Sequence, residues 1–446
     1  MKSASLPTPI IIEDTWNYSI TKNKEMKKAF YLIVAIIMVA CSKQKLSEQV
    51  PSKPSKQNIK LGIRSYDEAL RIAENAIGML EDSKSATRSG DKCRKIDISE
   101  SKVILNNSKT RGESDDLDSL IYVFNFENDE GFALVSASIN ADPLLAITEK
   151  GYYDPDVLSD IDGFNLFVEQ AKEYVLSKEL TSLKSEYETK DSIVGVSPYS
   201  VVGPFVTVKW GQVYAEGEFC DNGIAGCANT AMAQIFSYYG HPSTLSLTYC
   251  NGGTLTLNWP SIRSHGTKHF STNCSDLTVH HSISHLLREL GERNNSAYVS
   301  IDENHTYTLT LLYDNNTAIN TLNGLGYQYG SWTSYVGSYV RGQLDNHHLF
   351  IVMGLSHYWV LDGYMLGIVV HNTMYKIGDN WYYTGNTYTT TSYFNHYNWG
   401  FYGDSDGYYN ENVYNTQQVS LLDDGSLNNV LLVENSNWVK MLSIYY

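Results

Sequence analysis

Basic residues are scarce in this 446-residue chain: 33 Lys and Arg stand against 49 Asp and Glu, which gives a net charge of −16 at pH 7. This balance argues against a nucleic-acid partner, because phosphate backbones bind basic surfaces. Charged residues make up only 18% of the sequence, a share that does not fit helical repeats or coiled coils. The 34 Tyr, 8 Trp and 32 Gly favour a β-rich chain with aromatic packing, of α/β or α+β class.

Motifs for nucleotides and metals are also missing. The sequence contains no Walker-type Gly-Lys loop and no dinucleotide-binding fingerprint. His281 and His285 lie four residues apart on a helix-like stretch, but no Glu completes an H-E-x-x-H zinc motif. Both are interpreted as surface or capping histidines, and we expect neither a metal nor an organic cofactor.

The first apolar run, residues 29–40, is too short to cross a bilayer. Two lysines precede it and Cys41 ends it, which is typical of a secretory signal peptide. The ending MVAC, residues 38–41, resembles a bacterial lipobox, whose cysteine becomes the lipidated first residue of the mature protein. Residues 1–41 are thus interpreted as a signal region, and we expect an exported envelope lipoprotein held to the membrane through Cys41. A simple signal peptide with an incidental cysteine is the alternative.

The segments on either side of this signal carry no chemistry of their own. Residues 1–25 contain Pro, Asp and Glu, with which signal peptides do not begin, so Met26 is the expected start of the precursor. Residues 42–60 are rich in Ser, Lys, Gln and Pro, and we interpret them as a flexible tether.

The chain has six cysteines, and five remain if Cys41 carries lipid. An odd count in an exported protein leaves at least one thiol unpaired, and such a thiol is a candidate nucleophile. Spacing alone does not decide which cysteines pair. The candidates for a disulfide are Cys93, Cys220, Cys250 and Cys274.

Residues 61–195 have the pattern of a small α+β domain without catalytic residues. Ser65 and Glu68 form a plausible capping box before an amphipathic run, which predicts a helix. The whole segment contains no histidine. It therefore cannot supply the imidazole that many hydrolases use as a general base.

The remaining elements of this domain follow from apolar runs. Residues 120–126 and 131–137 flank a turn-forming tetrapeptide and predict a β-hairpin. A third run at 143–148 and a second helix near 164–176 complete the domain. The polar stretch 178–193 has no clear period, so we expect an exposed linker that favours proteolytic cleavage.

The stretch AGCANTAMAQIFSYY, residues 225–239, runs from a glycine turn into a strong helix pattern with Cys227 in the first turn. Unpaired N–H groups and the positive end of the helix dipole stabilise a thiolate at such a position. We therefore expect a lowered thiol pKa and a nucleophile near neutral pH. Ala231, Ile235 and either Tyr238 or Tyr239 should face the core.

A thiolate works best beside an imidazole that shares its proton and later protonates the leaving group. Among the 12 histidines, His357 heads a strand-like stretch, HYWVLDGY, that follows a turn. A rigid strand can aim its ring. The two residues together are the candidate nucleophile and general base.

Three stretches occur in a defined order: AGCANTAMAQIFSYYGHP around Cys227, SHYWVLDGY around His357, and NWGFYGDSDGYY at 398–409. Together they resemble the streptopain family of papain-like cysteine peptidases. Residues 131–153 also resemble the propeptide of such peptidases. The resemblance covers most of residues 60–415 and implies an α+β fold: a papain-like catalytic domain with a helical part and an antiparallel β part, preceded by a small α+β prodomain.

The resemblance also implies a role for each site residue. Cys227 would be the nucleophile, and His357 the general base and acid. Gln212 would lend its side-chain amide to the oxyanion hole, where losing one donor typically costs about 3 kcal/mol. Asn398 would orient the ring of His357, and Trp399 would shield that contact from water.

The sequence departs from the family pattern at several points. Ser356 replaces the glycine before the histidine, Phe401 replaces the second tryptophan of the NWGWGG stretch, and VYA at 213–215 replaces Pro-Tyr-Asn. His357 and Asn398 are 41 positions apart because of a Tyr- and Thr-rich insertion. This long spacing bears most on the orienting role of Asn398.

We interpret the chain as an exported cysteine endopeptidase zymogen, with an inhibitory propeptide at 61–195 and a catalytic domain at 196–446. Its partners would be protein or peptide substrates, its own propeptide, and a membrane through the lipid anchor. The alternative is a catalytically inactive surface lipoprotein that keeps the fold to bind ligands. A third possibility keeps the Cys–His chemistry but transfers acyl groups.

Overall fold

A computed structural model describes residues 62–446 of the chain apart from several stretches, and all described residues belong to one compact unit, residues 59–446. The predicted signal region, the tether and four cysteines, Cys41, Cys93, Cys250 and Cys274, lie outside the described residues. Among the helices that are described, none is both long and apolar enough to cross a membrane. The stretches left out after residue 61 are 86–93, 107–118, 184–188, 214–215, 250–252, 266–276, 303–304, 314–315, 355–356, 378–379, 415–419, 422–426 and 429–438.

The N-terminal part is an antiparallel sheet flanked by two helices, and we call it the prodomain. Its strands pair in the order β1-β2-β3-β4. The predicted small α+β domain is therefore present. Its elements are α2 (Tyr66–Ser85), η1 (Ile98–Glu100), β1 (Lys102–Leu105), β2 (Ser119–Asn125), η3 (Glu127–Asp129), β3 (Phe132–Ser136), β4 (Leu144–Thr148) and α3 (Asp162–Leu183).

Two local predictions for the prodomain are confirmed. The backbone N–H of Ser65 donates to the Glu68 carboxylate at 3.0 Å, and the backbone N–H of Glu68 donates to Ser65 Oγ at 3.3 Å. This reciprocal pair is the predicted capping box, and α2 begins at the next residue. β2 and β3 form the predicted antiparallel hairpin, with Asn125 opposite Phe132.

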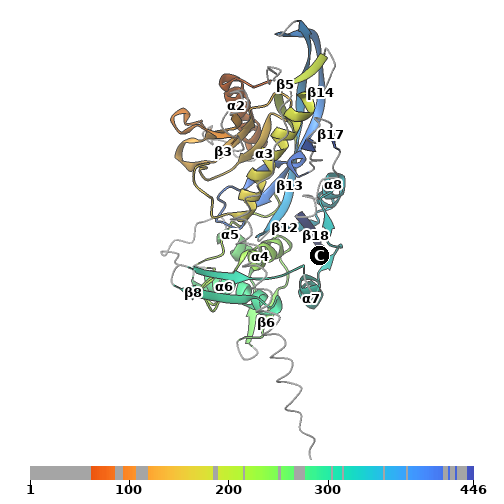
Figure 1. The fold of residues 1–446 in the computed structure, drawn as a ribbon. Helices are drawn as coiled ribbons and strands as arrows, with labels where there is room; N and C mark the ends of the chain where they lie inside the picture. Colours follow the sequence, from red (N-terminus) through yellow and green to blue (C-terminus); the bar gives the residue numbers. More distant parts are fainter. Residues whose placement is uncertain are drawn as a thin grey trace, which may run out of the picture. The chain divides into compact units, whose positions relative to one another are not determined.

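A group of helices follows the prodomain and forms one side of the catalytic domain. Figure 1 shows α4, α5 and α6 gathered together at one end of the domain, and α4 packs against the start of β13 (His357–Ile377) and against β12 (Leu349–Gly354). α4 begins after Gly226 and ends at Gly240, whose φ of 66° is the left-handed geometry of a helix C-terminus. The elements are α4 (Cys227–Tyr239), β6 (Thr244–Leu247), β7 (Gly253–Thr256), α5 (Trp259–His265), α6 (Leu277–Arg293), β8 (Ala297–Asp302), β9 (His305–Leu309), α7 (Thr317–Gly324) and α8 (Gly337–Asp345).

The β part of the catalytic domain is antiparallel, and its main path runs β15-β14-β13-β12-β18-β10. With the helices, it confirms the predicted α+β class of two unlike parts. The strands are β5 (Thr189–Val202), β10 (Gln328–Tyr329), β11 (Thr333–Ser334), β12 (Leu349–Gly354), β13 (His357–Ile377), β14 (Asn380–Asn398), β15 (Gly407–Asn410) and β18 (Val439–Tyr445); η5 (Glu411–Val413) follows β15, and β16 (Ser420–Leu421) pairs separately with β17 (Leu427–Asn428).

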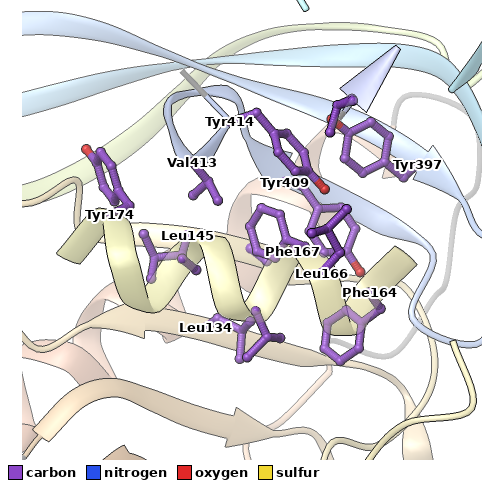
Figure 2. Packing of buried hydrophobic residues seen from close by; sticks show 14 of the residues in the cluster. Leu134, Leu145, Phe164, Leu166, Phe167, Tyr174, Tyr397, Tyr409, Val413 and Tyr414 are labelled. Atoms are coloured by element: carbon purple, nitrogen blue, oxygen red, sulfur yellow. The ribbon is translucent and has the colours of Figure 1, made fainter. Parts of the chain in front are cut away.

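The prodomain and the catalytic domain share one sheet and one core. β4 pairs with β15, where Thr148 lies opposite Gly407. A single buried cluster includes residues of both domains, and Figure 2 shows Phe167 of α3 against Tyr409 and Tyr414. The ring centroids of Phe167 and Tyr409 are 4.7 Å apart in an edge-to-face arrangement. Each domain therefore covers apolar surface of the other.

The long insertion between His357 and Asn398 is a β-hairpin. β13 and β14 pair along nearly their whole length, from Ile377 opposite Asn380 back to Val360 opposite Asn398. A hairpin lengthens the chain without separating the ends from which it starts. The 41-position spacing thus does not remove Asn398 from the neighbourhood of β13's first residues.

The exposed linker predicted at 178–193 is wrong over most of its length. α3 continues to Leu183, and β5 begins at Thr189. β5 pairs with the distal part of β13, from Val202 opposite Tyr364 to Thr189 opposite Tyr375, as Figure 1 shows. Polar composition concealed the strand because its partner lies far later in the chain. Only residues 184–188 fall outside the described residues here.

Candidate active site

Cys227 is the first residue of α4 because the chain turns sharply at Gly226. Gly226 has a φ of 86°, which L side chains rarely adopt, and a Cβ there would lie 3.0 Å from Thr308. The Cys227 thiol is free and accepts a hydrogen bond from the backbone N–H of Tyr358, the residue after His357. The predicted helix is confirmed, and Ala231 and Ile235 are buried as expected. Tyr238 and Tyr239 are only half-buried and pack against the same core.

The predicted lowering of the thiol pKa is wrong for this form of the protein. Burial raises the pKa of Cys227 to about 11, and the backbone N–H groups of Tyr358 and Ala228 offset only part of that effect. The nearby carboxylate of Asp162 raises the pKa further. The sulfur is therefore a neutral thiol near pH 7.

His357 is the first residue of β13 and is buried among aromatic rings. Its centroid lies 6.1 Å from that of Trp359 and 5.9 Å from that of Phe401. Its Nε2 is 3.0 Å from the carbonyl oxygen of Trp399, so Nε2 carries the proton and donates it. Burial lowers the pKa of His357 to about 4, against the opposing effect of that hydrogen bond. The imidazole is therefore neutral as well.

Asn398 acts on the backbone beside His357 and not on its ring. Its Nδ2 donates to the carbonyl of Val208 at 3.1 Å, and its Oδ1 accepts from the N–H of Gly400 at 3.1 Å. The Gly400 N–H belongs to the same planar peptide as the Trp399 carbonyl. Asn398 thus fixes the peptide whose oxygen bonds His357, which is an indirect version of the predicted role. Trp399 is fully buried, as shielding requires.

Gln212 is brought to the start of α4 by backbone contacts. The N–H of Ala225 donates to the Gln212 carbonyl at 2.6 Å. From α4 itself, Gln234 Nε2 donates to the carbonyl of Trp210 at 3.2 Å. The ring of Tyr402 covers the same loop, since a Cβ on Gly211 would lie 2.1 Å from it. Gln212 and Cys227 therefore lie on adjoining segments, and the Gln212 side chain is half-buried.

The start of prodomain helix α3 covers the histidine. A Cβ on Gly163 would lie 2.8 Å from His357 Cδ2 and 2.6 Å from Trp399 Cζ3, so only glycine fits at this position. The neighbouring Asp162 raises the pKa of both Cys227 and His357 by charge. The sequence reading missed Gly163 and Asp162. The available signal was a glycine directly before the helix predicted near 164–176; in the structure it lies in the first turn of α3, where a glycine weakens the helix and needs another reason.

The described residues also include a second cysteine, Cys220. Cys220 carries a free, buried thiol, so it forms no disulfide. Within the described part of the chain, no cluster of three His, Cys, Asp or Glu side chains could hold a metal. The structure brings Cys227, His357, Gln212, Asn398 and Trp399 into one region, and their catalytic roles stay predictions.

Comparisons with known proteins define the class. Residues 56–175 match the Spi protease inhibitor family, and residues 208–409 match the Peptidase C10 family. No curated protein matches the chain. A solved fragment of prointerpain A from Prevotella intermedia, with a Cys-to-Ala mutation, is similar at 18% sequence identity and a TM-score of 0.46, over 72% of this chain and 94% of that chain.

The chain is therefore a cysteine peptidase made as a zymogen, with an inhibitor-type prodomain before the catalytic domain. Residues 208–409 match the Peptidase C10 family, the streptopain family that the sequence motifs resemble. The α+β class expected from that resemblance is confirmed by the helices and the large antiparallel sheet.

Proposed function

We propose that the chain is an exported, lipid-anchored endopeptidase that hydrolyses peptide bonds through Cys227 and His357. The contact of Gly163 with the His357 ring carries the catalytic part of this proposal, whereas export and the lipid anchor rest on the sequence pattern of residues 29–41. An inhibitory segment needs to cover this histidine only if the histidine works in the reaction. The match of residues 56–175 to the Spi protease inhibitor family supports an inhibitory prodomain. The match of residues 208–409 to the Peptidase C10 family supports a mechanism that uses a cysteine thiol.

The reaction would begin once the prodomain leaves and water reaches the site. Exposure removes the burial that now keeps both groups neutral, so a proton passes from Cys227 to His357. The thiolate attacks the carbonyl carbon of the peptide bond, and the oxyanion accepts N–H bonds from the Gln212 amide and the Cys227 backbone. His357 then protonates the departing amine.

Water completes the cycle. It attacks the thioester carbon while His357 accepts its proton, and the Cys227–acyl bond breaks to release the acid and restore the thiolate. The Trp399 carbonyl would hold the imidazolium through Nε2 at both stages. No step requires a metal or an organic cofactor.

Processing tests the catalytic proposal. The wild-type full-length chain should shorten on incubation, whereas Cys227→Ala should stay full length on a denaturing gel. A thiol-directed epoxide should label processed wild type at Cys227, and His357→Ala should lose this labelling. Equal shortening of Cys227→Ala would show that another protease removes the prodomain.

Anchoring is tested separately, because Cys41 lies outside the described residues. Metabolic labelling with a fatty-acid analogue should mark the wild-type chain and leave Cys41→Ser unmarked. Cys93→Ser is the matched control. Mass spectrometry that finds an unmodified residue 41 at the mature N-terminus would exclude the lipid anchor while leaving export possible.

A further inference from the structure

A buried ion pair lies beside the active site and takes no part in the reaction described above. Asp406 is fully buried in the turn that follows Trp399, and its Oδ2 is 2.9 Å from Lys209 Nζ. Lys209 directly precedes the Trp210–Gln212 loop in sequence. The pair therefore ties the segment that leads to the oxyanion residue to the turn that carries the histidine's partner.

The other oxygen of Asp406 reaches the same residue that bonds His357. Oδ1 accepts the backbone N–H of Trp399 at 2.8 Å, and the Trp399 carbonyl accepts from His357 Nε2 at 3.0 Å. The Trp399 indole N–H donates to the Ser405 carbonyl at 3.0 Å, which closes the turn from the side-chain end. Trp399 is therefore the single residue that connects Asp406 to the His357 ring through hydrogen bonds.

The charge on Asp406 makes this clamp strong. A carboxylate binds a backbone N–H about twice as strongly as a neutral acceptor does, and more so where water is excluded. Burial raises the pKa of the Asp406 carboxyl, and Lys209 offsets only part of that rise. Three further charged groups face the pair: Glu149 of the prodomain at 3.7 Å from Lys209, and the bonded His396–Asp362 pair on the adjacent strands.

We propose that Asp406, paired with Lys209, is a positioning residue for His357: it holds the Trp399 backbone in place so that the Trp399 carbonyl stabilises the imidazolium. The proposal rests on the proposed role of His357 in the reaction. The DSDG segment, residues 404–407, would thereby help to position His357 and not only form part of the family motif. Asp406 itself touches no reacting atom.

The experiment compares Asp406→Asn with Asp404→Asn in the full-length chain, processed where necessary by a catalytic amount of tagged wild-type enzyme. Asp404 lies in the same turn and loses the same charge, but it is exposed and pairs with Lys150 of the prodomain. Using the processed form removes Glu149, whose backbone N–H also bonds the Asp406 carbonyl.

We expect Asp406→Asn to lower kcat about tenfold with little change in KM, since the lost interaction matters in the charged state of His357. The basic limb of the kcat/KM profile should move to lower pH, because the Trp399 hydrogen bond raises the pKa of His357 and its loss lowers that pKa. Asp404→Asn should match wild type in both measurements.

Lys209 supplies a second pair of variants should Asp406→Asn fold poorly. Lys209→Met should shift the same basic limb, and Lys209→Arg should restore it by keeping the charge. A wild-type pH profile in Asp406→Asn or Lys209→Met, whatever their thermal stability, would overturn the positioning role. Activity retained in His357→Ala would instead overturn the proposed function, so the two failures are distinguishable.

Discussion

At the scale of single residues, the position of a catalytic candidate can be predicted from local sequence, whereas its pKa depends on residues that are distant in the chain. A cysteine at a helix start and a histidine at a strand start are visible in sequence, because each depends on a local pattern. Their pKa directions are not visible, because they depend on the burial of the pair and on Asp162 in the prodomain. The same holds for Asn398, whose contact with Gly400 depends on a turn of the backbone.

Gln212 offers the sharpest residue-scale test of the oxyanion assignment. Gln212→Ala should lower kcat by about 100-fold or more with KM nearly unchanged, because the amide donates to charge that exists only in the transition state. Steady-state kinetics of the processed enzyme on a fluorogenic peptide would measure this. The exposed neighbour Val213→Ala is the control. A variant with raised KM and normal kcat would place Gln212 in substrate binding instead.

At the scale of elements, local signals were reliable and long-range pairing was not. The capping box at Ser65 and the hairpin of β2 and β3 were predicted because their partners are close in sequence. β5 was mistaken for a linker because its polar residues make a strand only when β13 supplies the hydrogen bonds. The contact of α3 with His357 could not be predicted either, because no sequence motif indicates which residues of two domains will touch.

The fit of α3 on the site predicts the effect of one added methyl group. Gly163→Ala puts a Cβ into His357 and Trp399, and overpacking of this kind costs about 1–3 kcal/mol, so the prodomain should dissociate roughly tenfold more readily. Self-processing of the full-length chain should be correspondingly faster on a gel time course. Gly78→Ala, in prodomain helix α2 with open space around it, should process at the wild-type rate. Identical rates for both variants would contradict the contact as the source of inhibition.

At the scale of the whole molecule, prodomain and catalytic domain fold as one body. The apolar runs predicted the first domain and the motif resemblance predicted the catalytic domain after it, but nothing in the sequence indicated that β4 would continue the catalytic sheet at β15. The Thr148–Gly407 pairing and the Phe167–Tyr409 contact join residues from opposite halves of the chain. Such contacts appear only when both halves are folded.

The buried histidines predict how the stability of this body changes with pH. Because the pKa of His357 is about 4 when folded and about 6.5 when unfolded, its contribution, roughly 3 kcal/mol, is present above pH 6.5 and is lost as the pH falls toward 4. Burial lowers the pKa of His396, but Asp362 and Glu149 outweigh that effect and raise it to about 9. The contribution of His396 is therefore full below pH 6.5 and is lost as the pH rises toward 9.

Urea unfolding of the full-length Cys227→Ala chain, which should not process itself, would measure this dependence. The free energy of unfolding should be greatest near pH 6.5 and fall on both sides. His357→Gln in the same background should weaken the decline on the acid side and leave the alkaline side unchanged. Stability that rises steadily from pH 6.5 to 9 would contradict the ion pair of His396 with Asp362.

The β13–β14 hairpin has a consequence for how enzymes of this kind diversify. Its two strands leave and re-enter the domain at neighbouring points, Val360 and Asn398, so residues can be added or removed at its tip in matched pairs while the base keeps its register. The distance along the chain between histidine and asparagine is then free to drift without any cost to the chemistry. A search that fixes this interval would overlook working relatives, whereas one that anchors on the two strand ends would recover them.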